Sequence, residues 1–410
     1  MAKVVIVCPS QPSRTPRLVR NAGALAAAGH DVTVVAPVFE NERIKEDHRI
    51  ASGALWDYIG VSILSPSGGS IPILSRLLRR AAFEVASRIR VASLGSTALI
   101  YGSERVMRAA DIKADFYLGQ QQSSLPIVAS LARRHGKPYG CDIEDILAES
   151  SSEPRRLFHA IETRYLGGAN VVLTMSRAAA EHLNREYELK AEPTVVHNCP
   201  SLAERGQLTI PIPSTSSRPS IYWFGQTLGP HSCALELLKA NVAAGSPCKI
   251  YLRGRPVPSY VDELWNFVRA SAVPDILEVL PVTPPDTMVA ECAKFDVLFG
   301  SQPSDELFHQ LAIGNKVFAG LAAGCALLLE DTIAHRVLCQ KMSSCSTVVA
   351  YRDPAALGAA LAGYALDRDR LIQQRRAAWE LGSSTYNWEY ESQKVVQAVA
   401  YALESNISCS

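Results

Sequence analysis

Several patterns that mark common classes of protein are missing from this sequence. None of its ten cysteines forms the close Cys-x-x-Cys pair that builds zinc sites, so we expect scattered, buried and reduced thiols. The 410 residues carry a formal net charge of only +1, which excludes a general electrostatic field for nucleic acid or membranes and leaves only local basic patches. No nucleic-acid partner is therefore expected.

Long hydrophobic runs are also absent. The apolar run Val4–Cys8 near the start is too short for a signal peptide. The longest candidate for a membrane span, Val317–Leu329, is broken by Gly320 and Gly324, and a core helix followed by a buried strand explains it better. We therefore expect a cytoplasmic protein.

What the sequence does contain is typical of a packed globular protein. Apolar residues make up 48% of the chain and charged residues 20%. A chain of 410 residues is too long for one hydrophobic core, because domains usually hold about 100–200 residues. Two domains are expected.

Short apolar runs alternate with helical spacing in the first 200 residues. The continuous run Val4–Val7 is typical of a strand that is covered on both faces. After it, Thr15 is a good helix N-cap, Pro16 fits the first turn, and Gly29 supplies the stop. Further strands are predicted at Val32–Ala36, Phe116–Leu118, Pro138–Asp142, Val171–Thr174 and Thr194–His197. This alternation predicts a parallel sheet with helices on both faces.

Residues 201–219 interrupt the pattern with prolines and a Ser/Thr cluster, which favours a linker. The alternation then resumes, with strands predicted at Ile221–Phe224, Lys249–Leu252, Ile276–Leu280, Asp296–Phe299, Ala326–Leu329 and Thr347–Ala350. One helix is predicted to begin at Thr283, and helical spacing returns between Trp388 and Leu403.

This organisation predicts an α/β fold with two doubly wound, Rossmann-like domains facing across a cleft. The predicted parts are a first domain over residues 1–200, the linker 201–219, a second domain over 220–385, and a C-terminal helix within 386–410 that packs back toward the first domain. Ligands bind at the carboxyl ends of parallel strands, because loops and helix N-termini converge there.

Seven segments, in order and over nearly the whole length, look like motifs of one enzyme family. They are Thr15–Arg20, Cys141–Ile146, Glu162–Arg164, Val172–Ser176, Val196–Asn198, Asn315–Phe318 with Leu321–Gly324, and Asn387–Glu389. The ordered set resembles the GT-B glycosyltransferases, specifically the retaining, nucleotide-sugar-dependent enzymes of glycosyltransferase family 4.

The resemblance implies a retaining glycosyltransferase that moves a sugar from a nucleoside diphosphate sugar to a hydroxyl of a glycan, lipid-linked or small-molecule acceptor. It implies that the first domain supplies the acceptor pocket and that the second holds the nucleotide. No metal or other cofactor is expected, since no Asp-x-Asp lies between the predicted strands. The alternative is a non-catalytic or repurposed GT-B protein that binds a sugar nucleotide or glycan, or acts as a partner subunit.

Candidate donor-binding residues lie in the second half. A pyrophosphate is bound by N–H groups at a helix start and by cations, and Asn315 and Lys316 offer both. Gly225 is expected to end a strand and to let the backbone approach the phosphates, and Arg253 ends the next strand. The plainer interpretations are a solvated lysine and a surface arginine.

Four positions depart from the family pattern, and at all four the family has a residue that contacts the substrate. Gln226 and His231 stand where the family has Arg and Lys. Ala319 replaces a glutamate that holds the ribose, and Glu144 replaces a histidine that touches the transferred sugar. These departures keep the non-catalytic alternative open.

Nearby polar residues offer substitutes for the missing groups. Asp305 or Glu306 can bind sugar hydroxyls or the ribose, with His309 in the same loop, and Glu330 can serve the ribose instead. The other interpretation is a solvated acidic turn. His231 can donate to a phosphate when it is protonated, because an adjacent diphosphate raises the pKa of the imidazole.

Asp142, Glu144 and Asp145 follow a strand of the first domain. Three acids are costly to bury unless a cationic group or solvent stabilises them. The candidates are Glu144, Asp145 and His309 for catalysis, and Arg17 and Asp142 for acceptor binding. In a retaining reaction the departing phosphate oxygen can take the acceptor proton, so the protein mainly positions groups and stabilises charge.

Residues 71–91 interleave arginines with apolar residues at helical spacing. The arginines are Arg76, Arg79, Arg80, Arg88 and Arg90, and the apolar residues are Leu74, Leu77, Leu78, Phe83, Val85 and Ile89. The resemblance implies a face for the anionic membrane surface that carries lipid-linked acceptors. The alternatives are a helix that packs its leucines on the first domain and a binding site for an anionic soluble acceptor.

Overall fold

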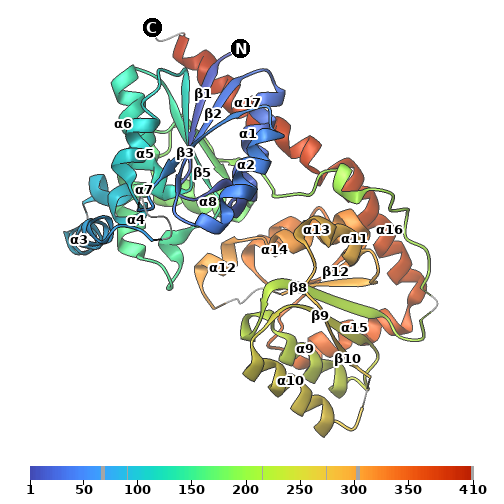
Figure 1. Cartoon of the computed structure of the whole chain (residues 1–410). Helices are drawn as coiled ribbons and strands as arrows, with labels where there is room; N and C mark the ends of the chain where they lie inside the picture. Colours follow the sequence, from blue (N-terminus) through green and yellow to red (C-terminus); the bar gives the residue numbers. More distant parts are fainter. Residues whose placement is uncertain (66–69, 90, 215, 274, 302–304, 408–410) are drawn as a thin grey trace. The chain divides into compact units, whose positions relative to one another are not determined.

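The computed structural model describes residues 1–65, 70–89, 91–214, 216–273, 275–301 and 305–407 (Figure 1). These residues form two compact units, each with its own sheet. The first unit contains Met1–Val196 and the chain from Ser392 onward, and the second contains His197–Glu391.

The first unit is built on a parallel sheet of seven strands in the order β3-β2-β1-β4-β5-β6-β7. They are β1 (Lys3–Val7), β2 (Asp31–Val38), β3 (Asp57–Ser62), β4 (Phe116–Gln120), β5 (Tyr139–Ile143), β6 (Val171–Thr174) and β7 (Thr194–Val195). The two central strands are apolar because both of their faces are covered: residues Val4–Val7 and Phe116–Leu118 have no exposed surface.

Helices flank this sheet on both faces (Figure 1). They are α1 (Pro16–Ala27), α2 (Ile44–Ser52), α3 (Ile73–Ile89), α4 (Gly95–Leu99), α5 (Ser103–Ala109), α6 (Leu125–His135), α7 (Arg155–Tyr165) and α8 (Arg177–Glu186). A last helix, α17 (Trp388–Ile407), begins in the second unit and ends in the first, where Val395, Val399 and Ala402 are buried.

The second unit has a parallel sheet of six strands in the order β10-β9-β8-β11-β12-β13. They are β8 (Ser220–Leu228), β9 (Lys249–Pro256), β10 (Leu277–Leu280), β11 (Val297–Gly300), β12 (Ala326–Glu330) and β13 (Ser346–Val349). Its helices are α9 (Ala234–Ala243), α10 (Pro258–Ala270), α11 (Met288–Cys292), α12 (Leu307–Leu311), α13 (Asn315–Ala323), α14 (Ile333–Cys339), α15 (Pro354–Leu366) and α16 (Arg368–Ser384).

The apolar stretch Val317–Leu329 forms most of α13 and then β12, and its residues are buried in the core of the second unit. The prediction of a core helix followed by a buried strand is confirmed. Among the described residues, no helix is long and apolar enough to cross a membrane.

The predicted α/β class with two doubly wound domains is confirmed. Sequence analysis missed β3, an edge strand with the half-exposed, polar pattern of Asp57–Ser62. The helix predicted to begin at Thr283 instead begins with a 3-10 turn at Pro285–Thr287 that leads into α11. Thr15 stands at the N-cap of α1, but its hydroxyl accepts no bond from the helix and instead donates to the carbonyl of Gln11.

The strand that was predicted to end before Gly225 also continues further. β8 runs on to Leu228, and its pairing with β9 shifts register between Phe224 and Thr227. Gly225 and Gln226 therefore form a bulge inside the paired region, not a loop that leaves the sheet.

Candidate functional site

Strand order locates the candidate sites in both units. In the first sheet the chain moves outward from β1 to β3 and then returns to β4 on the other side of β1; in the second, β9 and β11 flank β8. Loops diverge where the order reverses, and the resulting crevice at the carboxyl ends of the strands is where such folds bind ligands. The two candidate edges are therefore the ends of β1, β4 and β5, and the ends of β8, β11 and β12.

Lys316 occupies the switch point of the second unit. It lies in the first turn of α13, whose following residues are buried and fix the helix against the sheet. The Nζ atom lies 3.4 Å from the carbonyl oxygen of Ser301, which follows β11, and 4.9 Å from the centre of the ring of Trp223 in β8. Trp223 in turn donates its Nε1–H to Ser301 Oγ at 2.6 Å. Three neighbouring elements thus hold one ammonium group in place.

No carboxylate of the described residues forms an ion pair with Lys316. Burial disfavours the ammonium form and lowers the pKa of Lys316 to about 8. Burial also lowers the pKa of nearby His335 to about 4, and Lys316 contributes to that shift. The environment therefore holds a cation without its counter-charge, and an anion bound there would supply it.

Gly225 and His231 lie beside this lysine, but in a different way from the prediction. A Cβ atom on Gly225 would lie 2.7 Å from the Trp223 ring, so the glycine is required for the tryptophan to pack. His231 is exposed and presents its ring edge-on to Trp223 at 6.3 Å between centroids. Burial and the charge of Lys316 lower the pKa of His231. Gln226 is exposed in the adjacent bulge.

The other predicted donor-binding residues are more scattered. Glu330 ends β12, is 4% exposed, and accepts the backbone N–H of Tyr351 at 3.0 Å. Asp305 pairs with Arg352 at the surface, and Glu306 is the N-cap residue of α12. His309 lies in the same short helix, where burial lowers the pKa of the imidazole.

Asn315 is exposed at the first position of α13. Arg253 was predicted to bind the donor, but its guanidinium forms hydrogen bonds with other residues of the second unit. Its guanidinium donates to the Tyr222 hydroxyl, to the carbonyl of Pro281 and to Glu291, at 2.8, 2.6 and 2.7 Å. With three partners and 7% exposure, it braces β9 against α11.

The first unit carries a buried ion pair at its switch point. Arg17, from α1, donates from Nε and Nη2 to both oxygens of Asp142 at 2.6 and 2.9 Å. Asn21 adds a third bond to the same carboxylate at 2.6 Å, and Gln120 a weaker one at 3.3 Å. Arg17 is 1% and Asp142 0% exposed, so these two residues position the edge and have no surface to offer an acceptor.

Glu144 and Asp145 follow β5 directly and are only partly buried. Burial raises the pKa of Glu144 to about 7; Asp142 and Asp145 add to the rise, and Arg17 and Arg20 oppose it. Burial likewise raises the pKa of Asp145 to about 6. Both carboxyl groups therefore titrate close to neutral pH, as groups that exchange or orient a proton do.

A hydrogen-bond chain that was not predicted from the sequence ends at the backbone of Asp145. The Tyr187 hydroxyl donates to the fully buried Glu162 at 2.5 Å, and the side chain of Gln122 bonds to Glu162 and also donates to the Asp145 carbonyl at 2.5 Å. Gln121, which directly precedes Gln122, has a φ of 64°, a strained conformation for a residue other than glycine. The sequence motif Glu162–Arg164 already indicated that Glu162 has a role, but not which residues it contacts.

Comparisons with known proteins agree with this geometry. Residues 14–199 match the family model of the glycosyl transferase 4-like domain. The first unit carries a glycosyl transferase 4-like domain. The match confirms the expected class of enzyme, a glycosyltransferase. None of the curated proteins matches the sequence.

Solved structures of glycosyltransferases share the GT-B fold over the whole chain. HepE of Anabaena with UDP and glucose is 14% identical, with 99% of this chain and 100% of HepE covered and a TM-score of 0.67. Sucrose-phosphate synthase of Thermosynechococcus elongatus is 13% identical, with 99% and 100% covered and a TM-score of 0.67. TarM of S. aureus with fondaparinux, alpha-GlcNAc-glycerol and UDP is 7% identical, with 98% and 100% covered and a TM-score of 0.64. These likenesses confirm the resemblance to GT-B glycosyltransferases at the level of fold.

Proposed function

We propose that this glycosyltransferase retains configuration and transfers a sugar from a uridine diphosphate sugar to a hydroxyl of a glycan, lipid-linked or small-molecule acceptor. The observation that carries the proposal is Lys316, a cation at the switch point of the second unit that pairs with no carboxylate in the described part of the chain. The HepE structures contain UDP and UDP-glucose and the TarM structure contains UDP, which supports uridine diphosphate as the leaving group.

In this proposal the second unit binds the donor. Lys316 and the N–H groups at the start of α13, beside Asn315, neutralise the diphosphate. Gln226 and His231 approach from the bulge that contains Gly225 and from the turn after it. Asp305, Glu306, His309 and Glu330 are the candidates for the ribose and the sugar hydroxyls. Arg253 is left out, because the protein already satisfies its guanidinium.

The first unit acts on the acceptor. The acceptor oxygen forms a bond to C1 of the sugar as the bond from C1 to the β-phosphate oxygen breaks, and that departing oxygen takes the acceptor proton. Glu144 and Asp145 accept hydrogen bonds from the acceptor hydroxyls and orient them. Because the phosphate receives the proton, loss of the family's histidine at Glu144 removes a contact but not an essential base.

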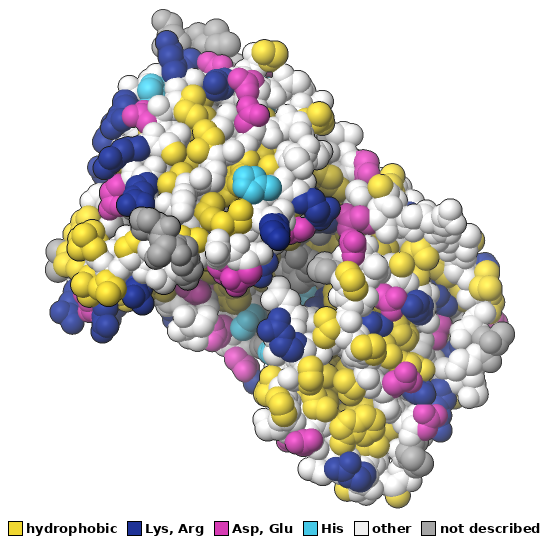
Figure 2. Space-filling view, viewed as in Figure 1, with side chains coloured by type: hydrophobic (Ala, Val, Ile, Leu, Met, Phe, Trp, Pro, Cys, Tyr) yellow, Lys and Arg dark blue, Asp and Glu magenta, His cyan; other side chains and the backbone are white. Residues whose placement is uncertain are grey.

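The surface of α3 supports a lipid-linked acceptor. Its three leucines and two further apolar residues do not pack on the first unit: Ile73, Leu74, Leu77, Leu78 and Val85 are 67, 67, 58, 55 and 44% exposed. The small residues Ala82 and Ala86 face inward instead. Figure 2 shows an apolar patch over α3 bordered by basic side chains. Arg76, Arg80 and Arg88 of this helix are exposed, Arg88 in an ion pair with Glu84, and Arg90 lies outside the described residues.

An apolar stripe with arginines at its margins matches the interface of an anionic leaflet, where each basic residue is worth roughly 1 kcal/mol. Sedimentation with vesicles that contain phosphatidylglycerol tests this face. Leu74→Ser with Leu77→Ser should release the protein from the vesicles, and the same exchanges at the exposed Leu202 and Leu366 should not. If all variants sediment equally with the vesicles, α3 does not bind the membrane and the proposal of a lipid-linked acceptor loses this support.

Release of the nucleotide tests the proposed reaction. The protein is incubated with a panel of UDP-, GDP- and TDP-sugars and a set of acceptors, and free nucleoside diphosphate is measured. We expect acceptor-dependent release from UDP-sugars, with the α-linkage of the donor preserved in the product. Release from another nucleotide sugar would correct the base, and an inverted product would refute retention.

The non-catalytic alternative rests on Ala319. Its side chain is 6% exposed on the buried face of α13, where the family's glutamate would hold the ribose. This alternative predicts that UDP binds and that no donor in the panel is turned over. Turnover of a single donor would refute it.

A further inference from the structure

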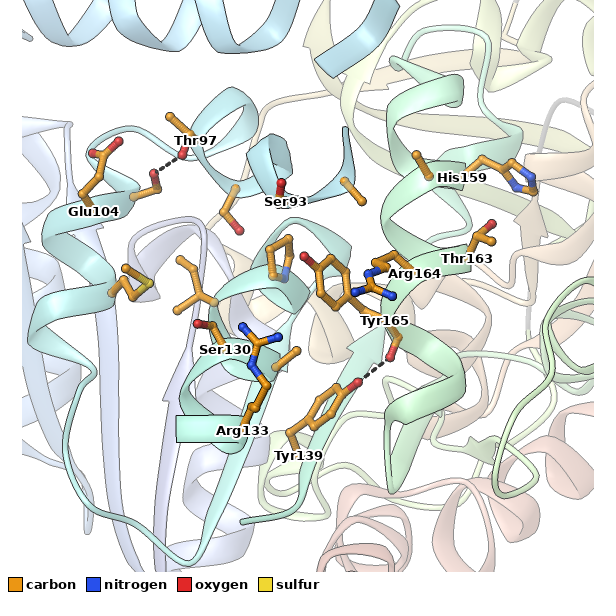
Figure 3. A pocket seen from close by; sticks show the side chains of 18 residues that line it. Ser93, Thr97, Glu104, Ser130, Arg133, Tyr139, His159, Thr163, Arg164 and Tyr165 are labelled. Atoms are coloured by element: carbon orange, nitrogen blue, oxygen red, sulfur yellow. Dashed lines mark hydrogen bonds between the residues drawn. The ribbon is translucent and has the colours of Figure 1, made fainter. Parts of the chain in front are cut away.

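A groove of about 970 Å³ lies in the helical layer of the first unit, away from its acidic edge (Figure 3). It is bounded by α5, α6 and α7, and by the turn at Ala92–Leu94 with α4 that follows it. Small residues, Ala129 on α6 and Ala160 on α7, leave the space open. Tyr139, in its wall, begins β5, whereas Glu144 and Asp145 follow the other end of that strand.

Two arginines face this groove. Arg133 comes from the last turn of α6 and Arg164 from the last turn of α7. Neither forms an ion pair or a side-chain hydrogen bond within the described part of the chain, and both line the groove together with Tyr165. Figure 3 shows both side chains beside the Tyr165 ring. Neighbouring arginines differ: Arg134 pairs with Asp111, and Arg155 with Glu149.

The rest of the lining suits an anion that also carries polar groups. Hydroxyl groups come from Ser93, Ser130 and Thr163, and Glu104 on α5 is the one carboxylate among the described residues of the wall. Hydroxyls donate to phosphate oxygens, and a guanidinium fork binds two of them at once. The Tyr165 ring offers an apolar face to the remainder of a ligand.

We infer that this groove binds the phosphate group of an anionic ligand between Arg133 and Arg164. The two like charges repel each other, and a phosphate would offset that repulsion and use both forks. The ligand is either a soluble phosphate monoester or the headgroup of an anionic lipid. A lipid headgroup is one of the two sources because Ala92 and Ser93 in the wall lie shortly after α3 in the sequence, and α3 is the helix with the exposed apolar face.

Binding is measured in a Lys316→Met background, so that phosphate cannot be captured by the second unit. Glucose 6-phosphate is titrated by calorimetry, and vesicles of phosphatidylcholine with and without phosphatidylglycerol are tested by sedimentation. The groove variant is Arg133→Ala with Arg164→Ala. Its matched control is Arg134→Ala with Arg156→Ala, which removes the same charge from the same two helices outside the groove. All four arginines are exposed, so both variants should keep the fold of the parent.

We expect the groove variant to lose at least about tenfold in affinity for one of the two probes, while the control keeps the affinity of the parent. A loss for glucose 6-phosphate identifies a soluble ester, and a loss only for phosphatidylglycerol vesicles identifies a lipid headgroup. The inference fails if neither probe binds, or if the groove variant and the control bind alike. Because the assay needs neither turnover nor UDP, its failure would leave the proposed transfer reaction unaffected.

Discussion

The carboxyl edges of the two sheets have the same topology and opposite electrostatics. At the first edge, Glu144 and Asp145 crowd beside Asp142, and their pKa values rise to about 7 and about 6. At the second, Lys316 has no acid beside it among the described residues, and its pKa falls to about 8. The doubly wound sheet supplies the place for a ligand, and a few side chains from the adjoining loops and helices decide what binds there.

The edges also differ in how their charges are compensated. Arg17 and Asp142 are buried but fully satisfied by each other, by Asn21 and by the carbonyl of Val196. Among the described residues, Lys316 has a long bond to a carbonyl and the face of an indole as its partners. A buried charge that is paired within the protein has a structural role, whereas a charge without a partner is available to bind a ligand.

Removing one charge from each edge should therefore have different effects on stability. Arg17→Met leaves the Asp142 carboxylate buried without its partner, and we expect it to lower the free energy of unfolding of the first unit by about 3–5 kcal/mol. Lys316→Met removes an ammonium that burial disfavours, so stability should stay the same or rise. Chemical denaturation without nucleotide measures both.

Arg14→Met is the control for the arginine, because its pair with Glu40 is more exposed and should matter by about 0–1 kcal/mol. A similar small effect for Arg17→Met would mean that the first edge is not held by the pair.

The second prediction separates the two edges by function. Glu144→Gln keeps the size of the side chain and removes the charge that orients the acceptor, so turnover should fall by about 10²-fold with UDP affinity unchanged. In the parent, kcat/KM should fall as the pH drops through about 7, because Glu144 then becomes protonated. That limb should vanish in the variant.

Glu153→Gln, an exposed change in the following loop, serves as the control. Turnover within about threefold of the parent in both variants would show that the acidic edge takes no part in transfer.

The third prediction concerns the nucleotide. Lys316→Met should weaken UDP binding by about 1.5–3 kcal/mol, as expected for one charge-assisted contact with a diphosphate. Lys341→Met, at an exposed lysine after α14, should bind UDP as the parent does. Calorimetry decides, and unchanged binding in both variants would place the nucleotide elsewhere.

Local sequence was enough to predict most of the fold but little of the geometry of either edge. Continuous apolar runs such as Val4–Val7 indicate covered strands, while β3, with half-exposed polar residues, has no such signature. The bulge at Gly225 depends on how β8 pairs with β9, and no local pattern encodes that register.

The contacts of the site residues could not be predicted either, because they join residues that are far apart in the sequence. Arg17 and Asp142 are 125 residues apart, and only the order of the strands brings them together. Sequence analysis could mark both as polar residues in motifs, but not that they satisfy each other. The same holds for Arg253, whose three partners lie in β8, after β10 and in α11.

The smallest expected effect is the pH dependence of UDP binding, and it tests whether the charge of Lys316 is what binds. The folded-state pKa lies below the ordinary value of 10.5, so the ammonium destabilises the free protein below about pH 8, and that penalty fades as the pH rises from about 8 toward 10.5. A bound diphosphate favours the ammonium and raises its pKa. UDP affinity should therefore be highest below pH 8 and fall by up to about tenfold between pH 7 and 9.

Lys316→Met should bind weakly and almost independently of pH over this range, whereas Lys316→Arg, which stays charged, should bind without the fall. Burial and Lys316 lower the pKa of His231 in the free protein, and Lys316→Met leaves this histidine in place, so a step that His231 produces would remain in that variant. A fall of equal size in the methionine variant would assign the titration to another group and leave the second edge without its distinguishing charge.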